Sequence, residues 1–220
     1  MIALLQERDD FRNFRPATMI AELVTPLDEF GEGRNHDVVV LGLAQGKRVL
    51  IGIESKNDEE LGPVIGSYLA KAQLENVARR AQGKTRLSQV PARIANLTRV
   101  VFGDKPVDVA DSRYQLLHGV AGTLIEAARR DADVAVFLLH VFVSASTDPA
   151  KAERNEKDLF QFAELLQVRA SENLRAGCLA GPFVAGGNAD VSVGLPFYIG
   201  VTRTTCRGPA AHGDDLPALG

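Results

Sequence analysis

The stretch from residue 37 to residue 56 constrains the fold of this 220-residue chain more than any other segment. Two short runs rich in Val, Ile and Leu flank the dipeptide Gln45-Gly46. Apolar runs joined by a two-residue turn that contains Gly are typical of a β-hairpin. With Gln45 and Gly46 as the central turn residues, the register of this hairpin places Asp37 opposite Glu54.

Three charged side chains are expected to meet at the open end of the hairpin. Side chains alternate along a strand, so Glu54 and Lys56 share one face, and Asp37 lies across from Glu54. Opposed carboxylates repel each other unless a cation neutralises them, and Mg²⁺ binds one or two carboxylates together with water and substrate phosphates. A neighbouring lysine can steady or deprotonate a metal-bound water, or stabilise developing negative charge. The pattern predicts metal-assisted phosphodiester hydrolysis, and the competing interpretation is a charged hairpin end that only contacts solvent.

Asp37, the hairpin and the tripeptide Glu54-Ser55-Lys56 together resemble the PD-(D/E)xK nuclease superfamily, the restriction-endonuclease-like phosphodiesterases. In that superfamily the Asp opens one strand and the (D/E)xK tripeptide closes the next. The resemblance implies Mg²⁺ as cofactor, with Mn²⁺ able to substitute, and Asp37 and Glu54 as its ligands. It also implies Lys56 as the catalytic lysine and the carbonyl of Ser55 as a further metal ligand. His36 stands where the pattern has Pro, at a position that varies within the superfamily.

Two further site residues follow from the resemblance alone. Many relatives carry a Glu on a helix before the hairpin, and residues 16–24 are expected to form such a helix, with Glu22 as an additional metal ligand. Relatives often carry an Arg or Gln on the helix after the hairpin that reaches the active site. Gln115 fits this role as a catalytic residue, and Arg113 is an alternative; helix capping or contact with solvent would equally explain both.

The rest of the chain is predicted to complete a single α/β domain over residues 1–206. With the hairpin, a helix at 113–130 and a continuous apolar strand at 134–143 match the restriction-endonuclease-like αβββαβ core that the resemblance implies. Two helices within residues 66–105 form an insertion, and a helix plus a strand follow the core at its C-terminal side.

The ends of these elements are predicted from turn, capping and proline residues. We expect helices at about 64–81, 91–101 and 150–170, and an edge strand at 191–202 that Pro196 interrupts. The acidic residues 58–60 are expected at the solvent-exposed start of a helix, and a contribution to metal binding is the alternative. The tail at 207–220, rich in Gly, Pro, Ala and Asp, is expected to be disordered.

Residues 66–105 also concentrate positive charge. The chain has a net charge of −3 and a pI of about 5.8. Between Gly66 and Lys105, eight basic residues stand against two acidic ones, which gives +6 for the segment and −9 for the remainder. A basic stretch in an acidic protein is typical of a surface that follows nucleic-acid phosphates, and the alternative is a solvated helical face. We therefore predict a nucleic-acid partner, and the resemblance favours DNA.

The sequence gives no support for a metal site built on cysteine or histidine, for a signal peptide or for a membrane span. Cys178 and Cys206 have no zinc-ligand spacing and imply no disulfide framework. His118 and His140 fall in a predicted helix and a predicted strand, and we expect both to be hydrogen-bonded core residues. The N-terminus lacks the pattern of a signal peptide, and the longest apolar run, 134–143, is too short to span a bilayer. A cytoplasmic protein without a membrane partner is therefore expected.

The favoured function is Mg²⁺-dependent hydrolysis of nucleic acid, but two alternatives stay open. One is a catalytically inactive nucleic-acid-binding protein of the same fold, and the other is a metal-dependent hydrolase of a small phosphorylated substrate. Salt-sensitive binding of nucleic acid would argue against the small-substrate hydrolase. A homodimer is compatible with the resemblance, because double-strand cutters of this fold often dimerise.

Overall fold

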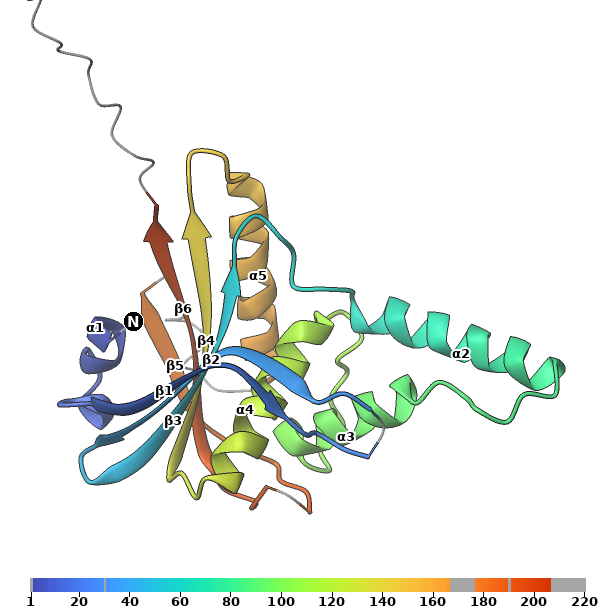
Figure 1. Ribbon diagram of the computed structural model, residues 1–220, viewed down its shortest axis with the longest axis horizontal. Helices are drawn as coiled ribbons and strands as arrows, with labels where there is room; N and C mark the ends of the chain where they lie inside the picture. The colour runs from blue at the N-terminus through green and yellow to red at the C-terminus, as the bar shows by residue number, and fades with distance from the viewer. Residues whose placement is uncertain (1, 30, 167–176, 190, 207–220) are drawn as a thin grey trace, which may run out of the picture.

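A six-stranded mixed sheet with helices on both faces forms the body of the protein, as seen in a computed structural model that describes residues 2–29, 31–166, 177–189 and 191–206 (Figure 1). The strands are β1 (Arg15–Thr25), β2 (Arg34–Ala44), β3 (Lys47–Lys56), β4 (Val134–Val143), β5 (Cys178–Val184) and β6 (Pro196–Thr205). Their order in the sheet is β1-β2-β3-β4-β6-β5. The pairs β3–β4 and β4–β6 are parallel, and the other neighbours are antiparallel.

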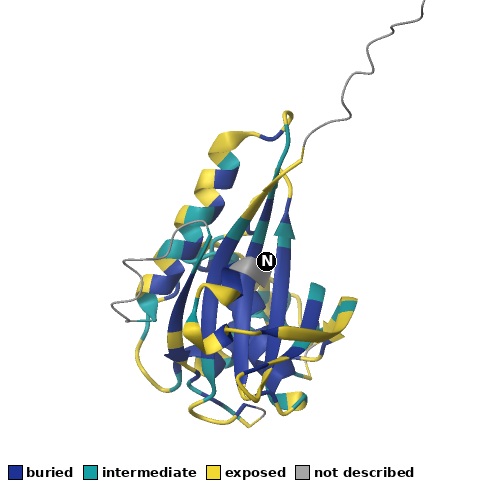
Figure 2. Cartoon of the chain, turned by 90° about the vertical axis from the view of Figure 1, so that its left-hand side faces the viewer, coloured by how far each residue is buried: buried dark blue, intermediate teal, exposed yellow. Residues whose placement is uncertain are grey.

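The helices cover the two faces of the sheet unequally. They are α1 (Ile2–Gln6), the short 3₁₀ helix η1 (Asp9–Phe11), α2 (Ile65–Ala81), α3 (Val90–Phe102), α4 (Tyr114–Arg129) and α5 (Pro149–Leu165). Residues of α3, α4 and α5 pack over the larger hydrophobic cluster, and α1 and η1 close a smaller cluster on the opposite face. Figure 2 shows the central strands between these layers as largely buried, whereas β1 at the edge of the sheet is mostly exposed. None of the helices that the structure describes is long and apolar enough to cross a membrane.

The central hairpin forms in the predicted register. β2 and β3 pair continuously from the turn to Val38↔Ile53, and the two turn residues have positive φ angles of 51° and 77°. Positive φ at both central residues is the geometry of a type I′ turn, whose twist matches that of the flanking strands. Continuing this register by one residue places Asp37 opposite Glu54. The turn therefore also determines where these charged residues lie.

Most predicted elements are confirmed. The ends of α2, α3 and α4 fall within about one residue of the predicted ends, and β4 has the predicted bounds. β4 lies between β3 and β6 and carries a hydrophobic cluster on each face, which explains its continuous apolar sequence. α5 ends at Leu165; residues 167–170 of the helix predicted there lie outside the described residues, as does the tail 207–220.

Two predicted elements are wrong. Residues 16–24 are not a helix but part of β1, which pairs with β2 along its length. Pro16 is tolerated there because β1 is an edge strand and its register shifts between Pro16 and Thr18. Residues 191–202 do not form an edge strand, because β6 lies between β4 and β5, and β5 is an additional strand that takes the edge. Pro196 is the first residue of β6, a position where the missing amide hydrogen is tolerated.

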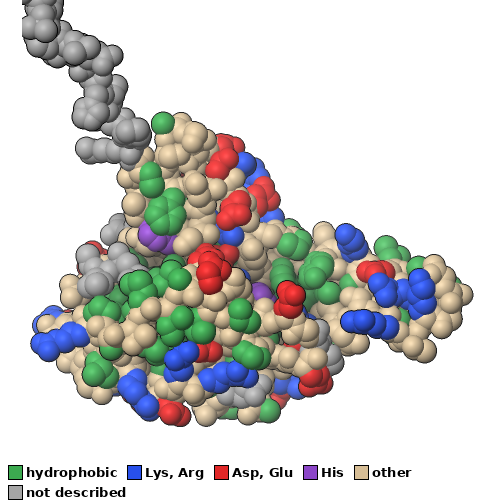
Figure 3. Space-filling view, viewed as in Figure 1, with side chains coloured by type: hydrophobic (Ala, Val, Ile, Leu, Met, Phe, Trp, Pro, Cys, Tyr) green, Lys and Arg blue, Asp and Glu red, His purple; other side chains and the backbone are tan. Residues whose placement is uncertain are grey.

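α2 and α3 form the predicted helical insertion between β3 and α4. α2 projects away from the sheet, and the two helices together make an arm beside the body (Figure 1). In Figure 3, Lys and Arg side chains gather on the outer part of this arm. The apolar side chains of Leu74 and Val77 on α2 are 71% and 63% exposed. The arm therefore combines positive charge with exposed apolar surface.

α4 approaches the sheet closely because a glycine on each side of the contact faces a larger side chain on the other element. A Cβ atom at Gly119 would lie 2.6 Å from the ring of Phe137, and one at Gly52 would lie 2.2 Å from Oγ1 of Thr123. Neither separation leaves room for a side chain, so larger residues would push α4 away from β3 and β4. This close approach brings side chains of α4 over the ends of β2 and β3, where the predicted site residues lie.

Candidate functional site

Glu54 and Lys56 lie on the face of β3 that α4 covers. Gly52 contacts Thr123 of α4 on this face, and the alternation of side chains places Glu54 and Lys56 beside it. Both are 4% exposed, and Nζ of Lys56 lies 2.8 Å from Oε1 of Glu54. The prediction that both groups share one face is confirmed, and the structure adds that both are buried.

Arg34, the first residue of β2, is a member of this site that the sequence reasoning missed. Its side chain is buried, and its guanidinium donates a hydrogen bond to Oε2 of Glu54. The side chain passes over Gly122 of α4, where a Cβ atom would lie 2.8 Å from Cγ of Arg34. Each oxygen of Glu54 therefore faces a cation, Arg34 on one side and Lys56 on the other.

Asp37 joins the site from the opposite strand. Its Oδ2 accepts a hydrogen bond of 2.5 Å from the backbone N–H of Ser55, the residue between Glu54 and Lys56. Burial lowers the pKa of the Arg34 guanidinium, and the negative charge of Asp37 opposes that shift. The structure thus brings Asp37, Glu54 and Lys56 to the open end of one hairpin, as the sequence predicts, together with Arg34.

Glu22 lies near this group but on a different element from the one predicted. It is an exposed residue of β1, and the flanking pairs Ala21↔Val38 and Leu23↔His36 place it across from Asp37. Its carboxylate accepts a hydrogen bond of 2.6 Å from Nδ2 of Asn35. Its role as an additional ligand stays a prediction.

Gln115 and Arg113 lie at the start of α4. Oε1 of Gln115 is buried and has no hydrogen-bond partner among the described residues. Arg113 donates hydrogen bonds to Asp158 at 2.8 Å and to Glu60 at 3.1 Å. Arg113 therefore ties α4 to α5 and to the chain that follows β3. The amide oxygen of Gln115 is free of hydrogen bonds to the described residues, and the catalytic role of Gln115 stays a prediction.

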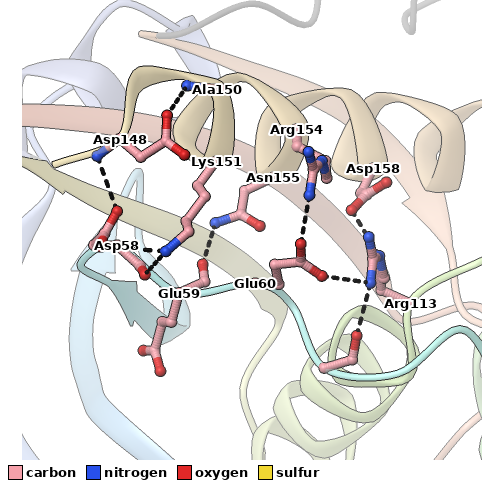
Figure 4. A network of polar contacts seen from close by, with 11 residues as sticks. Asp58, Glu59, Glu60, Arg113, Asp148, Ala150, Lys151, Arg154, Asn155 and Asp158 are labelled. Carbon is pink, nitrogen blue, oxygen red and sulfur yellow. Dashed lines mark hydrogen bonds and ion pairs between the residues drawn. The ribbon is translucent and has the colours of Figure 1, made fainter.

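The acidic residues 58–60 form a loop that α5 holds, not the predicted start of a helix (Figure 4). The carboxylates of Asp58 and Glu60 bind basic side chains of α5, and Asn155 donates a hydrogen bond of 2.7 Å to the carbonyl of Glu59. The carboxylate of Glu59, which is 60% exposed, lies 3.3 Å from Nζ of Lys56. The loop therefore fixes the chain directly after Lys56 and adds a negative charge at the solvent-facing rim of the site.

Two histidines beside the site are neutral at neutral pH. Burial lowers the pKa of His118 to about 3, and the positive charge of Arg34 acts in the same direction. Burial likewise lowers the pKa of His36 to about 4. His118 stacks on Tyr114 with ring centroids 5.1 Å apart, and Nε2 of His36 lies 3.1 Å from Oγ1 of Thr25. Neither imidazole adds charge to the site.

A divalent cation fits the donor set only under one condition. Asp37, Glu54 and the carbonyl of Ser55 are hard oxygen donors of the kind that Mg²⁺ prefers. Both oxygens of Glu54 are bonded to cationic side chains, however, and the described residues contain no group of three or more His, Cys, Asp and Glu side chains suited to a metal ion. Asp37 and Glu54 could hold a cation if Arg34 moved off Glu54 and water and substrate phosphate completed the coordination.

Comparison with known protein families matches residues 1–206 to a domain of unknown function, DUF6946. Comparisons with curated proteins and with solved structures give no match. The match covers all of the residues that the structure describes, so the site and the arm both lie within it.

Replacing His118 tests the neutral, half-buried imidazole. The unfolded chain takes up a proton near pH 6.5, whereas the folded state resists it down to about pH 3, so this histidine lowers stability progressively as the pH falls below 6.5. His118→Phe keeps the ring on Tyr114 and removes the titration. Denaturant unfolding at pH 7 and pH 5 should show a smaller loss for the variant, by up to about 2 kcal/mol. His140→Phe, at a more exposed imidazole, is the control with a smaller effect, and an unchanged acid slope in His118→Phe would contradict the assignment.

Proposed function

The chain belongs to the family described as a domain of unknown function (DUF6946), and we propose from its own geometry that it is a metal-dependent phosphodiesterase that hydrolyses nucleic acid. One observation carries this proposal: two carboxylates and a lysine from neighbouring strands converge at the open end of one hairpin. Two neighbouring carboxylates repel each other, and a divalent cation bound between them would offset that repulsion. A buried lysine beside them suits chemistry on a phosphate.

Each residue has a distinct role in the proposed reaction. When bound, Mg²⁺ would polarise the phosphate and activate a water molecule. Asp37 and Glu54 would hold this ion, and the hydrogen bond from the N–H of Ser55 keeps Asp37 oriented toward the end of β3. Lys56, fixed between Glu54 and Glu59, would orient the attacking water or stabilise the negative charge that develops on the phosphate.

The order of elements supports the finer assignment to a restriction-endonuclease-like core. Three antiparallel strands, β1, β2 and β3, are followed, after the insertion of α2 and α3, by α4 and then by β4, which runs parallel to β3. The superfamily pattern has the same strand–strand–strand–helix–strand sequence, with the Asp at the start of its second strand and the (D/E)xK tripeptide at the end of its third. In this chain a short helix, α1, and η1 precede β1.

The arm supports a polymeric, negatively charged substrate. Among the residues that the structure describes, four basic side chains of the arm form no ion pair: Lys71, Arg80, Lys84 and Arg86. Unpaired cations on a projecting surface suit a phosphate backbone, whereas a small phosphorylated substrate would need no such extended surface. DNA is the substrate that we propose.

Nucleic-acid binding without hydrolysis is the second candidate, and one observation favours it. Arg34 and Lys56 neutralise Glu54 directly, so the buried charges need no metal ion for their stability. A cleavage assay with purified protein separates the two candidates, because only the first predicts turnover that stops when the metal is chelated.

Lys56→Met tests the proposed reaction. The substitution keeps a long side chain and removes the amine, and we expect at least about a 100-fold loss of DNA cleavage measured in the presence of Mg²⁺. Glu60→Gln is the matched control, because Glu60 follows in the same loop but pairs with Arg113 and Arg154. Cleavage that survives Lys56→Met in a folded variant would contradict the proposed role of Lys56.

Neutralising the outer part of the arm tests its proposed binding to phosphates. The triple variant Arg80→Gln, Lys84→Gln and Arg86→Gln should weaken DNA binding and reduce the slope of log affinity against log salt by about one for each phosphate that the variant no longer neutralises. Fluorescence anisotropy over a range of salt concentrations measures both effects without any turnover. Lys47→Gln, at the hairpin turn, is the control. Equal salt slopes for the wild type and the triple variant would exclude the arm from the interface.

A further inference from the structure

Arg34 and a metal ion would compete for the same oxygen atom. Glu54 presents Oε1 to Lys56 at 2.8 Å and Oε2 to the guanidinium of Arg34. A cation held by Asp37 and Glu54 needs at least one of these oxygens. Lys56 belongs to the same strand as Glu54, whereas Arg34 reaches the carboxylate from β2 along a path that Gly122 leaves open. Arg34 is therefore the side chain whose movement would free Glu54.

The charges of the buried group already balance. In their usual ionised forms Arg34 and Lys56 contribute +2, and Asp37 and Glu54 contribute −2. The carboxylate of Glu59 stands at the rim, where solvent screens it. A divalent cation added to this group would leave two uncompensated positive charges in a buried place, which is unfavourable. Each nucleic-acid phosphate that enters supplies one negative charge.

Arg34 has unused capacity to bind such a phosphate. Its Nε is buried and lacks a hydrogen-bond partner among the described residues. A guanidinium presents its N–H groups in a planar fork that fits two oxygens of a phosphate, and charge-assisted bonds of this kind are strong. Asp37 is only partly buried, so the group meets solvent on the side of Asp37 and Glu59.

We propose, resting on the proposed function, that Arg34 couples substrate binding to metal binding. Without nucleic acid, Arg34 bonds to Glu54 and keeps the cation out. An entering phosphodiester takes the guanidinium from Oε2 of Glu54, adds negative charge, and leaves that oxygen free for the metal ion. By reciprocity, the metal tightens nucleic-acid binding by the same factor.

Titration with Mn²⁺ measures this coupling directly. Calorimetry of the full chain with Mn²⁺ alone, and then with Mn²⁺ in the presence of phosphorothioate-substituted DNA, should show that DNA tightens Mn²⁺ binding by at least about tenfold, equivalent to about 1.4 kcal/mol. Arg34→Gln removes the competing charge, so this variant should bind Mn²⁺ alone about tenfold more tightly than the wild type. DNA should then increase the Mn²⁺ affinity of the variant by a smaller factor than it does for the wild type.

Two matched variants make the test specific. Arg34→Lys keeps the charge and should bind Mn²⁺ alone as weakly as the wild type. Arg48→Gln removes an arginine near the turn of the hairpin that pairs with Asp131 and Asp133, and should leave Mn²⁺ binding unchanged. If Arg34→Gln binds Mn²⁺ no more tightly than the wild type, the inference is overturned. If that variant does not fold, the wild-type titrations with and without DNA still decide, since equal affinities overturn the inference.

The outcome is separable from that of the proposed function. The Mn²⁺ titrations need no turnover, so coupling in a wild-type protein that does not cleave DNA supports the role of Arg34 and contradicts hydrolysis. If the wild-type protein cleaves DNA but its Mn²⁺ affinity is the same with and without DNA, the role of Arg34 is contradicted and the proposed hydrolysis is supported.

Discussion

The burial of Glu54 is the interaction on which the rest of the site depends. A carboxylate that is 4% exposed would be strongly destabilising alone, and it persists because Arg34 and Lys56 each bond to one of its oxygens. Replacing such a buried group of charges with apolar side chains is often neutral or stabilising in proteins. Its presence at the end of a hairpin, beside a second carboxylate, therefore supports the proposed chemistry.

α4 links the packing of the sheet to this group. Its Gly119 lets it lie against β4, and its Gly122 makes room for the side chain of Arg34. One turn before Gly122 stands His118, and one turn after it stands Glu126, which accepts a hydrogen bond of 2.8 Å from Thr25 of β1. One face of α4 thus carries His118 and Glu126 on either side of Gly122, and a shift of the helix would disturb both the core and the charges.

The sequence predicted the features that local chemistry determines and missed those that depend on distant pairing. The Gln45-Gly46 turn sets the register, so the convergence of Asp37, Glu54 and Lys56 could be read from spacing. The helix expected at 16–24 follows from the resemblance, and Pro16 suits the start of a helix as well as an edge strand, so only the pairing with β2 decides for a strand. Arg34 was missed because it follows a segment rich in Gly and acidic residues, and no local signal shows that β2 begins there or that Gly122 accommodates its side chain.

The central claim is that Asp37 and Glu54 together hold a divalent cation once substrate phosphate is present. A crystal structure of the protein with DNA and Mn²⁺, collected to locate anomalous scattering from manganese, tests it most directly. The account predicts a manganese peak bound by both carboxylates, with Arg34 bonded to a phosphate and no longer to Glu54. A complex in which DNA is bound, Glu54 still contacts Arg34 and Lys56, and no manganese lies between the carboxylates would contradict it.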